Sequence, residues 1–228
     1  MSGTFKFFAG VSGVFCVSVC AIVLAPFSQL ASLAPDFKKD EDGVVSDVYP
    51  TAGSGAASEG REIYVSQGCQ TCHSQVLRGG ETADLDRGWG KRRTVARDYL
   101  FETTPVFGLY RLGPDLANVG APDWRNEPEG ETLRPVKRDA AWHYLHLYEP
   151  RVVSKASNMP AYRNLFEVRK RTGSQSPDAL VLPRGVQLEP GYEVVPKADA
   201  KSLVSYLMSL DRSHPLREAG GVTVSSKK

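Results

Sequence analysis

Gly68-Cys69-Gln70-Thr71-Cys72-His73 is the stretch of this 228-residue chain around which the fold is built. Two cysteines separated by two residues, with a histidine directly after the second, form the attachment pattern of a c-type haem. In this pattern Cys69 and Cys72 bond covalently to the haem vinyl groups, and His73 is held against the iron as its proximal ligand. The motif therefore predicts one covalently attached haem c.

The four cysteines allow two other interpretations, a zinc site and a redox-active dithiol. A zinc site requires a second ligand pair at similar spacing, whereas Cys16 and Cys20 lie far upstream in an apolar segment. A thioredoxin-like dithiol requires a βαβ setting and leaves His73 unexplained. For Cys16 and Cys20 we favour packing against a partner helix over a lipid or redox site.

The N-terminal part of the chain is strongly apolar. Residues 7–25 carry no charge, and the run is long enough to cross the hydrocarbon core as a helix. A signal peptide is the alternative, but the run is longer than a usual signal core, and Pro35 after Ala34 disfavours cleavage there. We expect an uncleaved transmembrane anchor, residues 1–35, with the chain after Leu30 across the membrane.

Residues 36–58 differ sharply from the anchor in composition. They combine a charged run at residues 38–42 with a stretch of small residues at 51–58. Such a composition cannot bury a core, so we expect a flexible linker. The haem domain is then predicted at residues 59–212, followed by a C-terminal tail at residues 213–228.

Two amphipathic helices are predicted at opposite ends of the haem domain. Ser58 is a candidate N-cap for a helix that ends near Gln67, and Gly60 leaves room for another helix to approach closely. Residues 199–210 carry apolar side chains at helical spacing. Crossing of these two helices is the frame of a class I cytochrome c. The predicted fold is therefore an all-α class I cytochrome c domain with long inserts, tethered to one N-terminal transmembrane helix.

A sixth iron ligand must come from one of five side chains, or the position stays open. The candidates are His143, His146, His214, Met159 and Met208. Met159 is the preferred ligand because Pro160 stiffens the loop and keeps Met159 out of a helix. Met208 is interpreted as core filling on the C-terminal helix, and His214 lies in a polar tail. With His73 and Met159 both bound, the iron transfers electrons and does not bind oxygen.

Pro114 is a further candidate haem-binding residue. It lies in Leu112-Gly113-Pro114-Asp115-Leu116, after the haem motif. In cytochromes c such a proline flanks the proximal histidine, and a nearby carbonyl accepts the histidine Nδ1 proton. Taken alone, the pattern is also compatible with a simple turn.

The charge pattern excludes a nucleic-acid-binding surface. The formal net charge is +2 with both signs mixed along the chain, whereas nucleic-acid binding requires a clustered basic face. Short basic runs such as Arg169-Lys170-Arg171 are interpreted as solvated loop.

Several blocks of sequence resemble one family, the mono-haem cytochrome c subunit (subunit II) of cbb-type haem–copper cytochrome c oxidases. The resemblance spans the anchor and most of residues 59–166. The blocks that carry it are Cys72-His73-Ser74-Gln75, Arg111-x-Gly113-Pro114-Asp115-Leu116, Trp142-His143-x-x-His146-Leu147 and Ser157-Asn158-Met159-Pro160.

The resemblance implies a non-catalytic electron-transfer subunit with one haem c. It would relay electrons from another cytochrome c to an integral membrane haem–copper catalytic subunit. Its location would be the bacterial inner (cytoplasmic) membrane, with the haem domain on the periplasmic side. For Trp142, His143 and His146, contacts to a partner or to the haem propionates, or plain packing, are favoured over catalysis.

Two alternatives remain at this point. One is another membrane-anchored cytochrome c, either the small subunit of a nitric oxide reductase or a free-standing electron carrier; the long block at residues 142–162 argues against the reductase. The other is an enzyme, such as a mono-haem peroxidase or a thiol-oxidising cytochrome, which requires an open or switchable sixth position. Carbon monoxide binding to the reduced chain separates the enzymes from the carriers.

Overall fold

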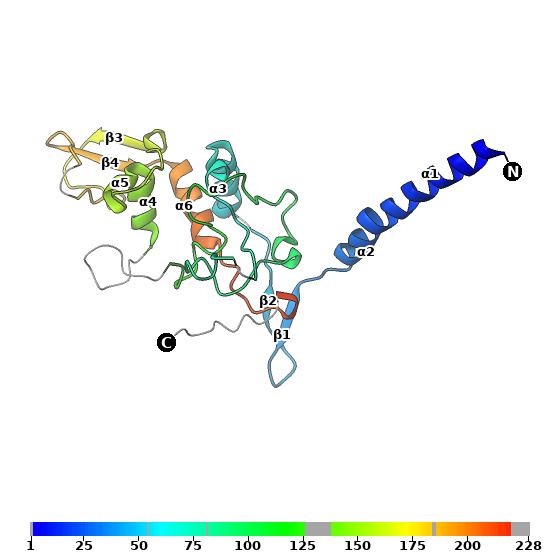
Figure 1. The fold of residues 1–228 in the computed structure, drawn as a ribbon. Coiled ribbons are helices and arrows are strands. Elements are labelled where there is room, and N and C mark those ends of the chain that lie inside the picture. The colour runs from blue at the N-terminus through cyan, green and yellow to red at the C-terminus, as the bar shows by residue number, and fades with distance from the viewer. Residues whose placement is uncertain (1, 54, 81, 126–137, 184–185, 220–228) are drawn as a thin grey trace. The chain divides into compact units, whose positions relative to one another are not determined.

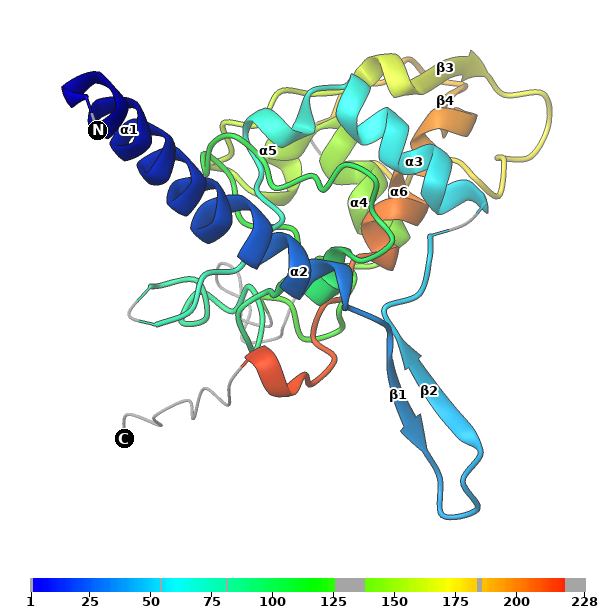
Figure 2. The same ribbon diagram turned by 90° about the vertical axis from the view of Figure 1, so that its right-hand side faces the viewer.

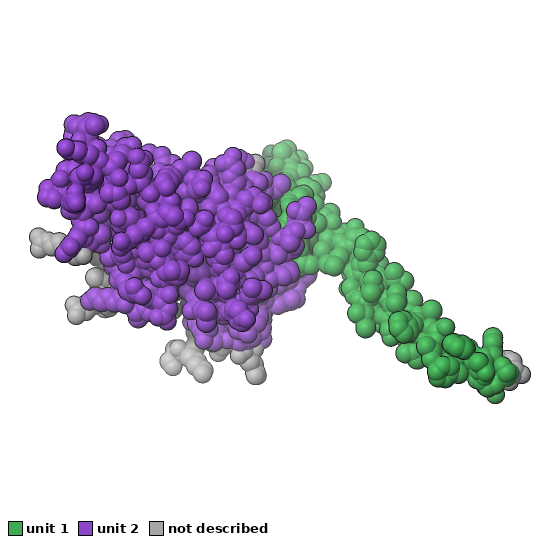
Figure 3. All heavy atoms as spheres, turned by 90° about the horizontal axis from the view of Figure 1, so that it is seen from above, with its two compact units in different colours: residues 1–51, 96–102 green, residues 52–95, 103–228 purple. Residues whose placement is uncertain are grey.

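The structure is a computed structural model that describes residues 2–53, 55–80, 82–125, 138–183 and 186–219. The chain divides into two compact units (Figure 3). One unit comprises residues 1–51 and 96–102, and the other comprises residues 52–95 and 103–228. Each unit is described by itself below.

The first unit begins with a long apolar helix (Figure 1). It consists of α1 (Gly3–Val19), a π-helical turn (Cys20–Leu24) and α2 (Ala25–Ala31). Pro26 lies in the first turn of α2 and has no N–H to donate. The π turn before it changes the pattern of backbone hydrogen bonds locally, and the helix continues. The whole helix, Gly3–Ala31, is long and apolar enough to cross a membrane, although a signal sequence meets the same criterion.

A β-hairpin follows the apolar helix (Figure 2). Strands β1 (Asp36–Lys39) and β2 (Val45–Tyr49) are antiparallel. The Asp40 carboxylate closes the turn by accepting the backbone N–H groups of Asp42 at 3.1 Å and Val44 at 2.8 Å. The segment predicted as a flexible linker therefore contains regular structure over much of its length.

The second unit is built on two helices that lie side by side, α3 (Gly55–Ser66) and α6 (Ala198–Ser209) (Figures 1 and 2). A Cβ atom at Gly60 would overlap the backbone carbonyl of Ser202, which confirms that this glycine permits a close helix approach. The Tyr64 and Tyr206 rings meet edge to face at 5.5 Å. Helix α3 begins at Gly55, so Ser58 lies inside the helix and does not cap it.

The remaining helices and strands cover α6 on another side. Helix α4 (Ala140–Tyr148) leads into the short helix α5 (Pro150–Val153), and the antiparallel strands β3 (Phe166–Lys170) and β4 (Tyr192–Pro196) follow. Helix α4 packs on α6, and the Phe166 ring of β3 contacts the α4 residues Tyr144 and Tyr148 at 6.5 and 5.3 Å between ring centroids.

The prediction of an all-α fold is wrong, because the chain contains two antiparallel two-stranded sheets. The second sheet is stabilised by burial of β4 and by a cross-strand ion pair. Val194 and Val195 are buried in β4, while Arg169 on β3 pairs with Glu193 on β4 at 2.9 Å. Part of the basic run at Arg169 is therefore a strand stabilised by a cross-strand ion pair, and not a solvated loop.

Candidate haem site

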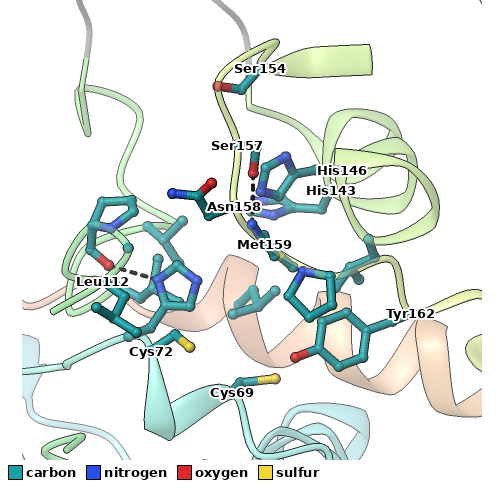
Figure 4. Close-up of a pocket in the computed structure, with 18 of the residues that line it drawn as sticks. Cys69, Cys72, Leu112, His143, His146, Ser154, Ser157, Asn158, Met159 and Tyr162 are labelled. Carbon is teal, nitrogen blue, oxygen red and sulfur yellow. Dashed lines mark hydrogen bonds between the residues drawn. The ribbon is translucent and has the colours of Figure 1, made fainter. Parts of the chain in front are cut away.

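A cavity of about 290 Å³ lies within the second unit, enclosed by segments that are far apart in sequence. The cavity is lined by all five residues predicted to bind haem, namely Cys69, Cys72, His73, Pro114 and Met159. Figure 4 shows the two cysteine sulfur atoms along one edge of this pocket and the Met159 loop across it. The structure thus brings the predicted site residues together in a single place.

The haem motif is shaped by a left-handed glycine at the end of α3. Gly68 has a φ of 72°, a conformation that a side chain disfavours, and it turns the chain into a 3-10 turn at Cys69–Thr71. The backbone N–H groups of Cys72 and His73 both donate to the Cys69 carbonyl, at 3.2 and 3.0 Å. Because of this tight turn, both cysteines and the histidine line the same cavity.

Both cysteines of the motif are free thiols in the structure. Cys69 is buried, and this burial raises the pKa of its thiol to about 11. The thiol is therefore protonated at neutral pH.

The imidazole of His73 is fixed in one tautomer. Its Nδ1 lies 2.8 Å from the carbonyl oxygen of Pro114, and because a carbonyl oxygen can only accept, Nδ1 carries the proton. Burial lowers the pKa of His73, an effect that the Pro114 carbonyl partly opposes. His73 is thus neutral, with Nε2 available as a ligand atom.

Gly113 leaves the space that the imidazole occupies. A Cβ atom at this position would overlap the ring of His73, so any larger residue would displace the imidazole. The Gly113 N–H also donates to the Cys72 carbonyl at 2.9 Å. The site fits a covalently attached haem in three respects. It has two free thiols, a neutral imidazole whose Nδ1 is already hydrogen-bonded, and a glycine that leaves space for that imidazole.

The five candidates for the sixth ligand are separated by their positions. Met159, His143 and His146 line the cavity, whereas Met208 and His214 do not. Met208 is 38% exposed on α6, so the expectation that it fills the core is wrong. The Met159 N–H donates to Ser157 Oγ at 3.2 Å, and the Tyr162 N–H donates to the Leu147 carbonyl at 2.8 Å, which pins the Met159 loop to α4.

Several residues that line the pocket have no distinctive signal in the sequence. They include Tyr64, Trp124, Arg125 and Tyr162. Tyr162 lies beside Cys69, and burial raises the pKa of this tyrosine to about 12. Tyr162 lies two residues after the Ser157-Asn158-Met159-Pro160 block, whereas nothing in the sequence indicates that Arg125 faces the cavity.

A buried ion-pair network supports the loop that carries Pro114. The Asp84 side chain is 0% exposed and pairs with Arg78 Nη2 at 2.9 Å and Arg111 Nη1 at 2.7 Å. Burial disfavours the charged form of Asp84, but the hydrogen bonds from both arginines outweigh it and hold the pKa of this carboxyl well below its usual range. Arg111 also donates to the Val76 carbonyl, so the network joins three loops next to His73.

We expect Asp84→Ala to lower the free energy of unfolding by about 3 kcal/mol, because it removes the buried carboxylate that pairs with both Arg78 and Arg111. Asp178→Ala, which removes an exposed pair with Lys201 at 2.5 Å, should cost less than about 1 kcal/mol. The Asp84 contribution is complete above the pKa of an unfolded aspartate, about 3.9, and declines as pH falls toward the lower folded pKa. Denaturant unfolding of both variants at neutral and acid pH tests this; equal losses at neutral pH would contradict it.

A half-buried histidine, two free thiols and a thioether around one cavity form the donor set of a c-type cytochrome. The chain matches the family model described as "Cytochrome C oxidase, mono-heme subunit/FixO" over residues 11–202. The chain therefore belongs to this family, which makes it a mono-haem cytochrome c subunit of a cytochrome c oxidase type complex. A search among curated proteins gave no significant match.

Proposed function

We propose that this chain is a membrane-anchored mono-haem c-type cytochrome that relays electrons to the catalytic subunit of a cbb-type haem–copper terminal oxidase. The observation that carries the proposal is the convergence of Cys69, Cys72, His73 and Met159 on one cavity, in a member of an oxidase-subunit family. Family membership favours this function over a nitric oxide reductase subunit or a free-standing carrier.

Each of these residues has a distinct role in the proposal. Cys69 and Cys72 hold the haem through thioether bonds, and His73 and Met159 are its axial ligands. The bound haem supplies one-electron exchange at its iron. Pro114 keeps the His73 proton on Nδ1, which orients the ring and raises the electron density on Nε2, while a thioether ligand raises the reduction potential.

The remaining parts of the chain position this haem for its partners. Residues 1–35 anchor the chain in the bacterial inner membrane by one span, and residues 36–58 connect the anchor to the haem domain on the periplasmic side. Another cytochrome c is the electron donor, and an integral membrane haem–copper subunit is the acceptor. Neither the haem domain nor the C-terminal tail, residues 213–228, performs catalysis.

Removing the anchor should separate haem binding from electron delivery. Deleting residues 1–31 and supplying a cleavable signal keeps the Ala34 carbonyl, which Arg97 binds, and leaves α3 and α6 intact. The truncated chain should carry its haem normally. Oxygen consumption by the membrane subunit should fall several-fold at equimolar amounts, because a bimolecular encounter replaces an intramolecular one, and it should recover when excess truncated chain is added.

A chain with an unrelated transmembrane helix in place of residues 1–31 is the matched control. It should restore part of the activity by holding the haem domain at the membrane. Full oxygen consumption by the truncated chain at equimolar amounts would contradict the proposed role of the anchor. Failure of the full-length chain to co-purify with a haem–copper subunit would contradict the oxidase assignment itself.

A further inference from the structure

The wall of the pocket formed by α4 presents two buried ring nitrogens without partners. Trp142 Nε1 and His143 Nε2 are buried and accept or donate no hydrogen bond within the described part of the chain. Both side chains line the cavity, and His143 is only 3% exposed. Leaving a buried polar group unpaired is unfavourable, because the group loses its hydrogen bonds to water. Two such groups on the same wall indicate that a hydrogen-bonding group of the ligand is absent from this position.

Two arginine side chains lie close to these nitrogens. Arg125 lines the cavity, and Arg138 lies 5.6 Å from the centre of the Trp142 ring. Arg138 Nη1 also donates to the carbonyl oxygens of Trp124 and Arg125, at 3.3 and 2.7 Å, which holds its charge at this end of the pocket. Burial, together with the neighbouring His146 and Arg138, lowers the pKa of His143 to about 4, so its ring is neutral with one N–H to donate.

The described residues that line the cavity include no aspartate or glutamate. Asp139, the acid at the start of α4, is already used as the helix cap, where its side chain accepts the Trp142 backbone N–H at 3.0 Å. This end of the pocket therefore combines neutral N–H donors with two nearby guanidinium groups. Such a combination suits an anionic ligand group that accepts hydrogen bonds.

The position of the thiols shows which part of a haem would reach this end. In Figure 4, Cys69 and Cys72 lie at one edge of the pocket, and His143 and His146 lie at the opposite edge. The vinyl groups of a haem that bond to such cysteines are on the opposite side of the macrocycle from its two propionates. A haem attached at Cys69 and Cys72 therefore directs its carboxylates toward α4.

We propose that Trp142 Nε1 and His143 Nε2, beside Arg125 and Arg138, bind the propionate carboxylates of the haem. This inference rests on the proposed function, because it requires a haem attached at the two cysteines. The donors would fix the propionates and partly neutralise their negative charge. Since negative charge near the iron favours the ferric state, binding the propionates in this way raises the reduction potential.

The test uses the full-length chain in its membrane complex and compares His143→Leu, His143→Gln and Trp142→Phe. Leucine removes the hydrogen bond, whereas glutamine keeps an N–H donor of similar reach. Trp89→Phe is the matched control, because Trp89 is buried but does not line the cavity. The readouts are the propionate bending bands in the resonance Raman spectrum and the reduction potential of the haem, with covalent haem measured on a denaturing gel.

We expect His143→Leu and Trp142→Phe to shift the propionate bands and lower the potential, His143→Gln to stay close to wild type, and Trp89→Phe to leave the bands unchanged. Unshifted bands in both His143→Leu and Trp142→Phe would overturn the inference. Equal shifts in His143→Leu and His143→Gln would also overturn it, because they would show that His143 contributes packing and not a hydrogen bond. A change of spin state in His143→Leu would identify His143 as an iron ligand and also overturn it. These outcomes leave the proposed function intact as long as the gel shows covalent haem; a wild-type chain without covalent haem would overturn both.

Discussion

Replacing Cys69 and Cys72 together by alanine should abolish haem retention on a denaturing gel. Covalent thioether bonds survive unfolding, whereas axial ligation by His73 does not, so the haem per denatured chain should fall from one to zero. Each single substitution should leave one thioether bond and a haem that stays with the chain. Haem-dependent peroxidase staining and intact-mass measurement both report this result.

The other cysteine pair of the chain supplies the control. Cys16 and Cys20 are also free thiols with a short spacing, but they lie in the apolar N-terminal helix. Cys16→Ser with Cys20→Ser should retain haem at the wild-type level. Haem that remains on the Cys69/Cys72 double variant, or that disappears from the Cys16/Cys20 variant, would show that the attachment site has been assigned to the wrong cysteines.

The second large effect is expected at Met159. Met159→His should keep the iron low-spin and lower its reduction potential by tenths of a volt, within the range of roughly 0.8 V that axial ligands span. The cause is that imidazole favours the ferric state relative to a thioether. Each fall of about 59 mV lowers the equilibrium ratio of ferrous to ferric haem tenfold for a given donor, so oxygen consumption through this haem should also slow.

Met208→Leu is the matched control for Met159→His. Met208 is on α6, is 38% exposed and does not line the cavity. Its replacement should leave the potential unchanged and alter stability by less than about 1.5 kcal/mol. Spectroelectrochemical titration of the three chains gives the comparison, and an unshifted potential in Met159→His would remove this methionine as the ligand.

Features encoded in a few neighbouring residues could be predicted from the sequence. The turn at Cys69–Thr71 follows from Gly68 and the motif itself, and the last helix follows from the apolar spacing at residues 199–210. The close approach at Gly60 is also a local signal, because only a residue without a side chain permits it. The turn places the two cysteines and the histidine close together, whereas the Pro114 and Gly113 loop fixes the orientation of the imidazole.

Features that depend on distant partners could not be predicted. Strands β3 and β4 have five residues each, which is too short for a clear alternation, and Arg169 of β3 finds its partner Glu193 only when the two strands pair. Nothing in the sequence around Asp84 indicates that it pairs with Arg78 and Arg111, because the pairing depends on how the loops fold together. The hairpin of β1 and β2 similarly relies on an Asp40 turn within a charged stretch whose composition indicates a flexible linker.

The most direct test of the central claim follows the haem of this chain during turnover. The intact membrane complex is reduced by its donor, mixed with oxygen, and monitored at the c-type haem absorbance that is missing from the complex of the Cys69/Cys72 double variant. If this chain relays electrons, that absorbance should become oxidised as fast as oxygen is consumed and return to the reduced form when oxygen runs out. A haem that stays fully reduced throughout oxygen consumption would contradict the account.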